Sequence, residues 1–246
     1  MASALPDLPQ TEIVIIEMTN AFRVENQLAR VTPNTALHTA AQAYADYLAR
    51  TGTFAHTADG RQPADRAQVA GYRYCMVAEN LALNQSNRGF ETRDLAARMI
   101  EGWKNSPPHR AAMLAPLVTE IGIGIARAPD ADPKFLTVQL FGRPDSFKYE
   151  FHVENRAGAP IPYVLGEKNN TVASQTSVRH TACVPHEITF DIGKVTAKFD
   201  ASDGGAFVIT RGADGRPRVD HFQAADKPAT VIAKARRTAP AVRPAP

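Results

Sequence analysis

The sequence predicts an α+β protein in which a layered domain of helices and strands precedes a small all-β module and a disordered tail. Three observations support this order. Apolar residues recur at helical spacing through much of the first hundred residues. Two later runs, 119–126 and 134–142, alternate in the manner of β-strands. Beyond Asp145, short alternating runs are separated by turn signals and no helical periodicity is evident.

Three helices are expected in the first half. The first spans 11–28, and the segment after it, which contains Pro33, breaks its pattern. The second is capped by Asn34 and ends at Gly52, and the third begins near Thr92 and stops before Pro107. Their apolar faces consist of Ile15, Met18, Phe22 and Val24, then Leu37, Ala40, Ala41, Tyr44 and Leu48, then Leu95, Met99, Ile100 and Trp103.

The two alternating runs predict a pair of strands. Isoleucines alternate with glycines in 119–126, and larger apolar residues alternate with polar ones in 134–142. The Pro-Asp-Ala-Asp-Pro segment between them is typical of a turn, so the strands should pair antiparallel. Helices that flank such strands indicate a layered α/β arrangement.

Residues 147–222 predict a small, sandwich-like all-β module. The remainder, 223–246, is rich in Ala, Pro and Arg and should be disordered, because it cannot bury enough apolar surface to fold. Strands are expected over Phe147–Val153, Glu187–Ile192, Val195–Phe199 and Ala206–Thr210.

The charge distribution argues against a nucleic-acid-binding protein. The net charge is +3, but the tail from Ala224 onward carries five basic residues against one acidic residue, which leaves −1 for the rest. No run approaches the roughly 20 apolar residues that a membrane-spanning helix needs. The opening residues lack the basic and apolar regions of a signal peptide, so a cytosolic protein and the mature form of an exported one both stay open.

Common catalytic motifs are missing from the sequence. It contains no Gly-x-Ser-x-Gly elbow, P-loop, His-Glu-x-x-His or Cys-x-x-Cys. Chemistry-bearing residues gather instead in three polar segments, each beside an apolar element: Phe54–Thr57, Ala78–Ala82 and Trp103–Arg110.

These three segments, followed by Thr119–Gly124 and Val138–Gly142, resemble the motifs of the CAP superfamily: cysteine-rich secretory proteins, antigen 5 and pathogenesis-related proteins. The likeness is to the bacterial branch, and it covers slightly more than half of the chain. It implies that residues 9–142 form a three-layer α-β-α sandwich. It also implies a secreted or periplasmic protein.

The resemblance further implies a cleft lined by His56, Glu79 and His109. Neutral imidazoles commonly bind divalent transition metals, so Zn²⁺ or another divalent cation is a candidate cofactor. Glu79 would be a third ligand, an orienter of an imidazole or a base for a bound water. Taken alone, however, Glu79 also suits a loop carboxylate that accepts backbone N–H groups. Further residues expected to line the cleft are Asn80, Ser106 and Gln139.

Many eukaryotic members carry a further Glu a few residues before the last His, where this chain offers Ser106. Glu120, on an expected strand, is not an obvious replacement. The resemblance therefore does not supply a complete set of four cleft residues.

The two cysteines, Cys75 and Cys183, allow two interpretations. They form a disulfide in an exported protein, or they are separate buried thiols. A second candidate metal cluster is His180, Cys183 and His186, although residues three apart in a regular strand point to opposite faces. A bridge between the cysteines would exclude that cluster, because it consumes the sulfur.

Two functions are consistent with these features. The favoured one is a secreted binding module that holds a divalent metal or a small apolar or lipid-like ligand, with the β-module contacting a protein partner or the cell envelope. The alternative is a metal-assisted hydrolase of peptide or envelope polymer with Glu79 as base. A serine route through Ser106 and His109 is less favoured, because no third residue orients the pair.

Overall fold

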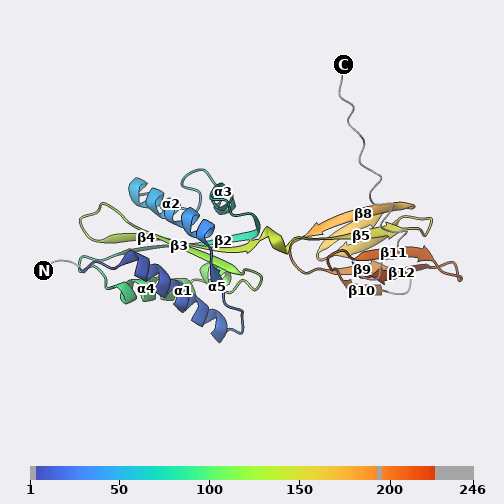
Figure 1. Cartoon of the computed structure of the whole chain (residues 1–246), viewed down its shortest axis with the longest axis horizontal. Coiled ribbons are helices and arrows are strands. Elements are labelled where there is room, and N and C mark those ends of the chain that lie inside the picture. Colours follow the sequence, from blue (N-terminus) through green and yellow to red (C-terminus); the bar gives the residue numbers. More distant parts are fainter. Residues whose placement is uncertain (1–3, 193–195, 225–246) are drawn as a thin grey trace, which may run out of the picture. The chain divides into compact units, whose positions relative to one another are not determined.

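The chain divides into two compact units, of which unit 1 is Met1–Phe147 and unit 2 begins at Lys148 (Figure 1). This computed structural model describes residues 4–192 and 196–224. The predicted disordered tail, 223–246, therefore lies outside the described residues except for its first two positions.

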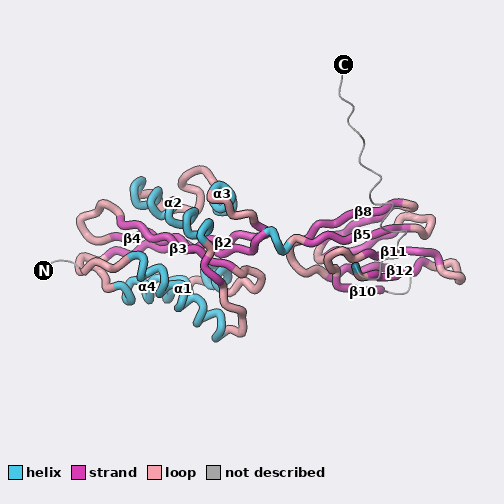
Figure 2. The backbone as a smooth tube through the Cα atoms, in the orientation of Figure 1, coloured by secondary structure: helices cyan, strands magenta, loops and turns pink. Residues whose placement is uncertain are grey.

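Unit 1 is a three-layer α-β-α sandwich, as predicted (Figure 2). Its four-stranded sheet has the order β1-β3-β4-β2, in which β1 is parallel to β3 and the other neighbours are antiparallel. Helices α2 and α3 cover one face, and α1, α4 and α5 cover the other. The elements are α1 (Leu8–Glu25), β1 (Thr32–Pro33), α2 (Thr35–Thr51), α3 (Pro63–Val69), β2 (Tyr74–Gln85), α4 (Thr92–Lys104), α5 (Pro107–Met113), β3 (Glu120–Arg127) and β4 (Lys134–Pro144).

Capping residues set the helix ends. The Asn34 side chain accepts the N–H of Ala36 at the start of α2, and Gly52 ends that helix in a left-handed conformation with φ of 70°, both as predicted. Helix α1 begins earlier than predicted, because the Asp7 carboxylate caps it. Pro107 opens α5 instead of only interrupting α4, since a proline lacks the N–H that a first helical turn leaves unpaired.

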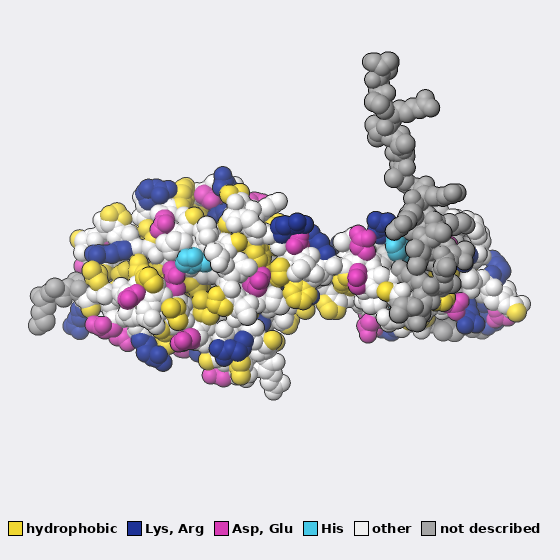
Figure 3. All heavy atoms as spheres, in the orientation of Figure 1, with side chains coloured by type: hydrophobic (Ala, Val, Ile, Leu, Met, Phe, Trp, Pro, Cys, Tyr) yellow, Lys and Arg dark blue, Asp and Glu magenta, His cyan; other side chains and the backbone are white. Residues whose placement is uncertain are grey.

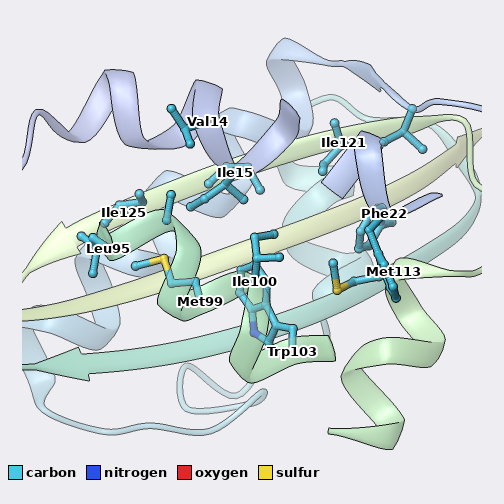
Figure 4. Packing of buried hydrophobic residues seen from close by; sticks show 14 of the residues in the cluster. Val14, Ile15, Phe22, Leu95, Met99, Ile100, Trp103, Met113, Ile121 and Ile125 are labelled. Atoms are coloured by element: carbon cyan, nitrogen blue, oxygen red, sulfur yellow. The ribbon is translucent and has the colours of Figure 1, made fainter. Parts of the chain in front are cut away.

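The alternation of isoleucine and glycine in β3 serves two different faces of the sheet. Ile121, Ile123 and Ile125 enter the apolar core beneath α1 and α4, where Figure 4 shows Ile125 beside Leu95 and Ile121 towards the end that holds Phe22. On the opposite face, a Cβ on Gly122 would lie 2.2 Å from the Leu37 backbone. Helix α2 therefore packs directly on the bare glycine face of the strand.

The segment Ala78–Ala82 is the middle of a strand and not a loop. It belongs to β2, an edge strand of the sheet, where Glu79 is opposite Leu140 and Asn80 is opposite Gln139 of β4. The interpretation of Glu79 as a loop carboxylate is therefore wrong. Because successive strand residues point to opposite faces, Glu79 and Asn80 serve different sides of the sheet.

Unit 2 consists of two four-stranded sheets, of order β10-β9-β6-β7 and β12-β11-β5-β8. One buried cluster draws on both sheets, which confirms the predicted sandwich-like module. The elements are a short 3₁₀ turn (Asp145–Phe147), then β5 (Tyr149–Asn155), β6 (Ile161–Leu165), β7 (Lys168–Val172), β8 (Thr176–Ala182), β9 (Glu187–Asp191), β10 (Thr196–Asp200), β11 (Ala206–Arg211) and β12 (Pro217–Phe222).

One face of unit 1 is mixed in charge. On the face that Figure 3 shows, acidic and basic side chains are interspersed among apolar ones, so that face presents no extended patch of one sign. Among the described helices, none has the length and apolar content needed to cross a membrane.

Candidate functional site

The three predicted site residues come from three elements around the edge strand β2. Glu79 lies on β2, His56 on the loop between α2 and α3, and His109 on α5. Helices α3 and α5 both contact β2, α3 from one layer and α5 from the other. The edge of the sheet is thus where residues of both helical layers can converge on one strand.

His56 and Glu79 form a direct hydrogen bond. The distance from His56 Nδ1 to Glu79 Oε1 is 2.8 Å. The Glu79 side chain is 1% exposed, whereas that of His56 is 52% exposed. A buried carboxylate therefore holds one nitrogen of an imidazole whose other side reaches solvent.

Arg66 completes this arrangement and was missed in the sequence. One terminal nitrogen donates to Glu79 Oε2 at 2.7 Å and to the carbonyl of His56 at 3.0 Å. The other donates to Asp59 Oδ1 and to the carbonyl of Arg61, both at 2.9 Å. Arg66 thereby neutralises the buried Glu79 and fixes the backbone of the loop that carries His56.

Both oxygens of Glu79 are engaged, one by His56 and the other by Arg66. Burial raises the pKa of Glu79, and the charge of Arg66 and the hydrogen bond from His56 oppose that rise. An engaged, buried carboxylate suits the orientation of His56 better than proton transfer to a bound water.

His109 has a different polar partner. Its Nδ1 lies 2.7 Å from the hydroxyl of Ser106, the residue before the first turn of α5. Burial lowers the pKa of His109, and the charge of His56 lowers it further. His109 is therefore held as a neutral imidazole at neutral pH, which is the form that binds metals.

Asn80 and Gln139 lie buried behind the site and are 1% and 0% exposed. Asn80 Nδ2 donates to the carbonyl of His109 at 3.1 Å and to Gln139 Oε1 at 2.9 Å, and Gln139 in turn donates to the hydroxyl of Thr19. Of the three residues predicted to line a cleft, Asn80 therefore supports the backbone of α5, and Gln139 holds Asn80 in place. Asn80 Oδ1 is a buried acceptor without a hydrogen-bond partner.

The arrangement of these elements and motifs matches a known family. Residues 16–141, more than half of the chain, match the sequence model of CAP, the cysteine-rich secretory protein family. The chain belongs to the CAP family. Unit 1 is its CAP domain, and we call unit 2 the β-module.

Three similar solved structures come from bacteria. An outer surface protein from Borrelia burgdorferi has 23% identity and a TM-score of 0.47, over 55% of this chain and 92% of that one. An extracellular protein containing an SCP domain from Bacillus anthracis has 23% identity and a TM-score of 0.46, over 55% of this chain and 41% of that one. A cysteine-rich secretory protein from Staphylococcus aureus has 21% identity and a TM-score of 0.39, over 55% and 39%. No curated protein matches the chain.

The candidate site of the CAP domain offers a metal ion two ligand atoms and not three. Within residues 4–192 and 196–224, no group of three or more His, Cys, Asp and Glu side chains is arranged to hold a metal ion. Glu79 has both oxygens engaged, and the Nδ1 atoms of His56 and His109 are engaged by Glu79 and Ser106. The ring atoms left for coordination are the Nε2 atoms of the two histidines.

The prediction of a second metal cluster, formed by His180, Cys183 and His186 in the β-module, is wrong. Cys75 and Cys183 are both disulfide-bonded, so the sulfur of Cys183 is consumed and the alternative of two separate thiols is excluded. His180 points its Nε2 at the hydroxyl of Tyr163, 2.6 Å away. His180 and Cys183 are thus committed to other partners.

Glu120 has a structural role in the CAP domain. It accepts hydrogen bonds from the hydroxyl of Tyr72 and from Asn34 Nδ2, the side chain that also caps α2. It therefore does not replace the missing glutamate, in agreement with the sequence.

Proposed function

We propose that the protein is a secreted binding module whose CAP domain holds a divalent cation, with Zn²⁺ as the first candidate, through Nε2 of His56 and His109. The observation that carries this proposal is the complete engagement of Glu79 by His56 and Arg66. A carboxylate that bonds Nδ1 of a ligating histidine fixes its tautomer and raises its basicity. When bound, the cation would supply a Lewis-acidic centre with positions open to water or to an oxygen-bearing ligand.

The geometry favours binding over hydrolysis. A hydrolytic base needs a lone pair aimed at water, whereas the Glu79 side chain is 1% exposed and each of its oxygens already accepts a hydrogen bond from the protein. Ser106 and His109 are within hydrogen-bond distance, but no acidic side chain among the described residues hydrogen-bonds to His109. The pair therefore lacks the orienting group on which an activated serine depends.

Export is the second part of the proposal. Disulfides persist in oxidising compartments, and both cysteines of this chain are disulfide-bonded. We take Cys75 to pair with Cys183. Thiol counting in denaturant should then find no free thiol before reduction and two after it, and the mass of the unreduced chain should be that of a monomer. Two free thiols in protein recovered from the envelope fraction would contradict the pairing.

The binding proposal is tested by calorimetric titration with Zn²⁺ near neutral pH. The wild-type chain is compared with a His56→Ala/His109→Ala variant, and His180→Ala serves as the matched control in the β-module. We expect the double variant to lose at least about tenfold in affinity, since each imidazole is a ligand, and the control to keep it. Equal affinity in the double variant, or no binding to the wild type, would contradict a metal at this site. The latter result would direct the search to lipid-like ligands.

A further inference from the structure

A second concave site lies on the CAP domain between α2 and α3. It is a groove of about 510 Å³, within the range of small-molecule sites. Its lining includes Tyr47 and Arg50 of α2, Val69 of α3 and Arg61 of the connecting loop. Neither His56 nor His109 is among its lining residues.

The floor of the groove is aromatic. Tyr47 stacks on Tyr44 with ring centroids 6.1 Å apart and planes 13° apart. The hydroxyls of these two tyrosines donate to the carbonyls of Ala58 and Ala55, which fixes the orientation of both rings. Beside them, Val69 is 73% exposed, a large exposed fraction for an apolar side chain. Tyr44 is 1% exposed, so the partly exposed Tyr47 ring and the exposed Val69 side chain form the surface suited to a flat apolar ligand.

The rim of the groove carries unpaired positive charge. Arg50 and Arg61 are exposed, and neither forms an ion pair with any residue of the described ranges. The guanidinium of Arg50 lies 5.6 Å from the centre of the Tyr47 ring. The remaining charged groups of the lining are Arg66 and Asp59, which form an ion pair at 2.9 Å, and Arg66 forms a second ion pair with Glu79. The groove therefore presents two arginines without an ion-pair partner beside an aromatic floor.

We propose that this groove is a second binding site, whose ligand is a small planar aromatic anion. The ring of the ligand would lie against Tyr47 and Val69, and its carboxylate or phosphate would pair with Arg50 and Arg61. Guanidinium groups match such anions with two parallel hydrogen bonds and also stack on flat rings. A flexible acyl chain would gain less from the rigid Tyr47 ring, because it loses more conformational entropy on binding.

Arg66 separates the groove from the His56 site. It lines the groove, but its terminal nitrogens are used by Glu79, by Asp59 and by two loop carbonyls. The ligand would consequently be recognised by Arg50 and Arg61 and not by Arg66. The two sites are therefore testable independently, and failure of one leaves the other standing.

The test uses 2-naphthoate as the probe, titrated into the full chain and followed by its fluorescence. We expect saturable binding that weakens about tenfold or more in Arg50→Gln/Arg61→Gln, because two charge-assisted contacts are lost. Arg30→Gln, which removes an exposed arginine outside the groove, is the matched control and should bind as the wild type does. Neutral 2-naphthol and the acyl anion decanoate should each bind about tenfold more weakly than 2-naphthoate.

Two substitutions of Tyr47 separate the contribution of ring stacking to binding from that of the two arginines. Tyr47→Leu removes the ring and should weaken binding about fivefold, whereas Tyr47→Phe keeps the ring and should leave binding within about twofold. The proposal is overturned if 2-naphthoate does not bind saturably, if the double arginine variant binds it as tightly as the wild type, or if decanoate binds more tightly than 2-naphthoate. Equal affinities of the Leu and Phe variants would overturn the assignment of Tyr47.

Discussion

Histidines in the two units have different kinds of neighbours. In the CAP domain, His56 and His109 each direct Nδ1 at a polar side chain, and the ring of His56 is half exposed. In the β-module, His180 stacks on Phe151 at 5.0 Å and His221 stacks on Phe207 at 4.6 Å. The same residue type thus belongs to a polar site in one unit and to an aromatic core in the other. The partners of a histidine, more than its spacing in the sequence, separate a candidate ligand from a packing residue.

The two β-module histidines also differ from each other. His180 Nε2 is hydrogen-bonded to the buried Tyr163 hydroxyl, while His221 Nε2 is buried without a partner. Removal of the unpaired His221 nitrogen would therefore leave no other group unsatisfied, unlike removal of His180.

The largest effect is expected from breaking the polar network of the CAP domain. Arg66→Met leaves Glu79 buried without its cation and should lower the free energy of unfolding by about 3–5 kcal/mol. Urea denaturation can be followed by the fluorescence of Trp103, which is the chain's single tryptophan and lies in the CAP-domain core. The Arg66→Met/Glu79→Leu variant is the control and should recover part of the loss. A loss below about 1 kcal/mol for Arg66→Met would show that the pair does not hold the site together.

A smaller effect should separate the two β-module histidines. His180→Phe leaves the buried Tyr163 hydroxyl without its partner and should cost about 1–3 kcal/mol. His221→Phe keeps an aromatic ring against Phe207 and removes a buried nitrogen that has no partner, so it should not lower the free energy of unfolding. Scanning calorimetry of the β-module transition measures both. Equal losses would mean that the hydrogen bond to Tyr163 contributes nothing beyond packing.

The smallest effect concerns pH. Burial, and then the charge of His152, lower the pKa of His180 in the folded state below its ordinary value of 6.5. Below about pH 6.5 the unfolded chain therefore takes up a proton that the folded β-module resists, so stability falls as the pH drops towards the folded-state pKa. The β-module transition temperature, measured from pH 8 to pH 5, should fall less in His180→Phe than in the wild type. An identical fall in both would assign the pH dependence to other groups.

Local chemistry explains which parts of the fold the sequence could predict. Asn34 caps the start of α2, and Gly52 ends the helix in a left-handed conformation. Both signals are local, because they depend only on residues at the ends of the helix. The alternation in β3 was readable because its two faces differ so strongly in side-chain size. β7, β8 and β12 were missed, since short strands with exposed polar residues give little alternation of apolar side chains. β6 was also missed, and its run Ile161–Leu165 contains a proline, which weakens a strand signal.

The site was predictable only in part, because it depends on tertiary contacts. Motif resemblance brought His56, Glu79 and His109 together, but it did not reveal that Glu79 is buried in β2. The local pattern nearest to Arg66 was the capping box of Gln62 and Asp65, which marks the start of α3, the helix that carries Arg66. Its ion pair with Glu79 requires α3 to pack on β2, and no spacing rule predicts that contact.

The most direct test of the central claim follows the ring nitrogens of all histidines by ¹⁵N NMR during a Zn²⁺ titration of the full chain. Nδ1 of His56 is held by Glu79, and Nδ1 of His109 by Ser106. The account therefore predicts that the Nε2 resonances of these two histidines move on metal addition while those of His180 and His221 stay in place. Shifts confined to the β-module histidines, or no shift at any histidine, would contradict it.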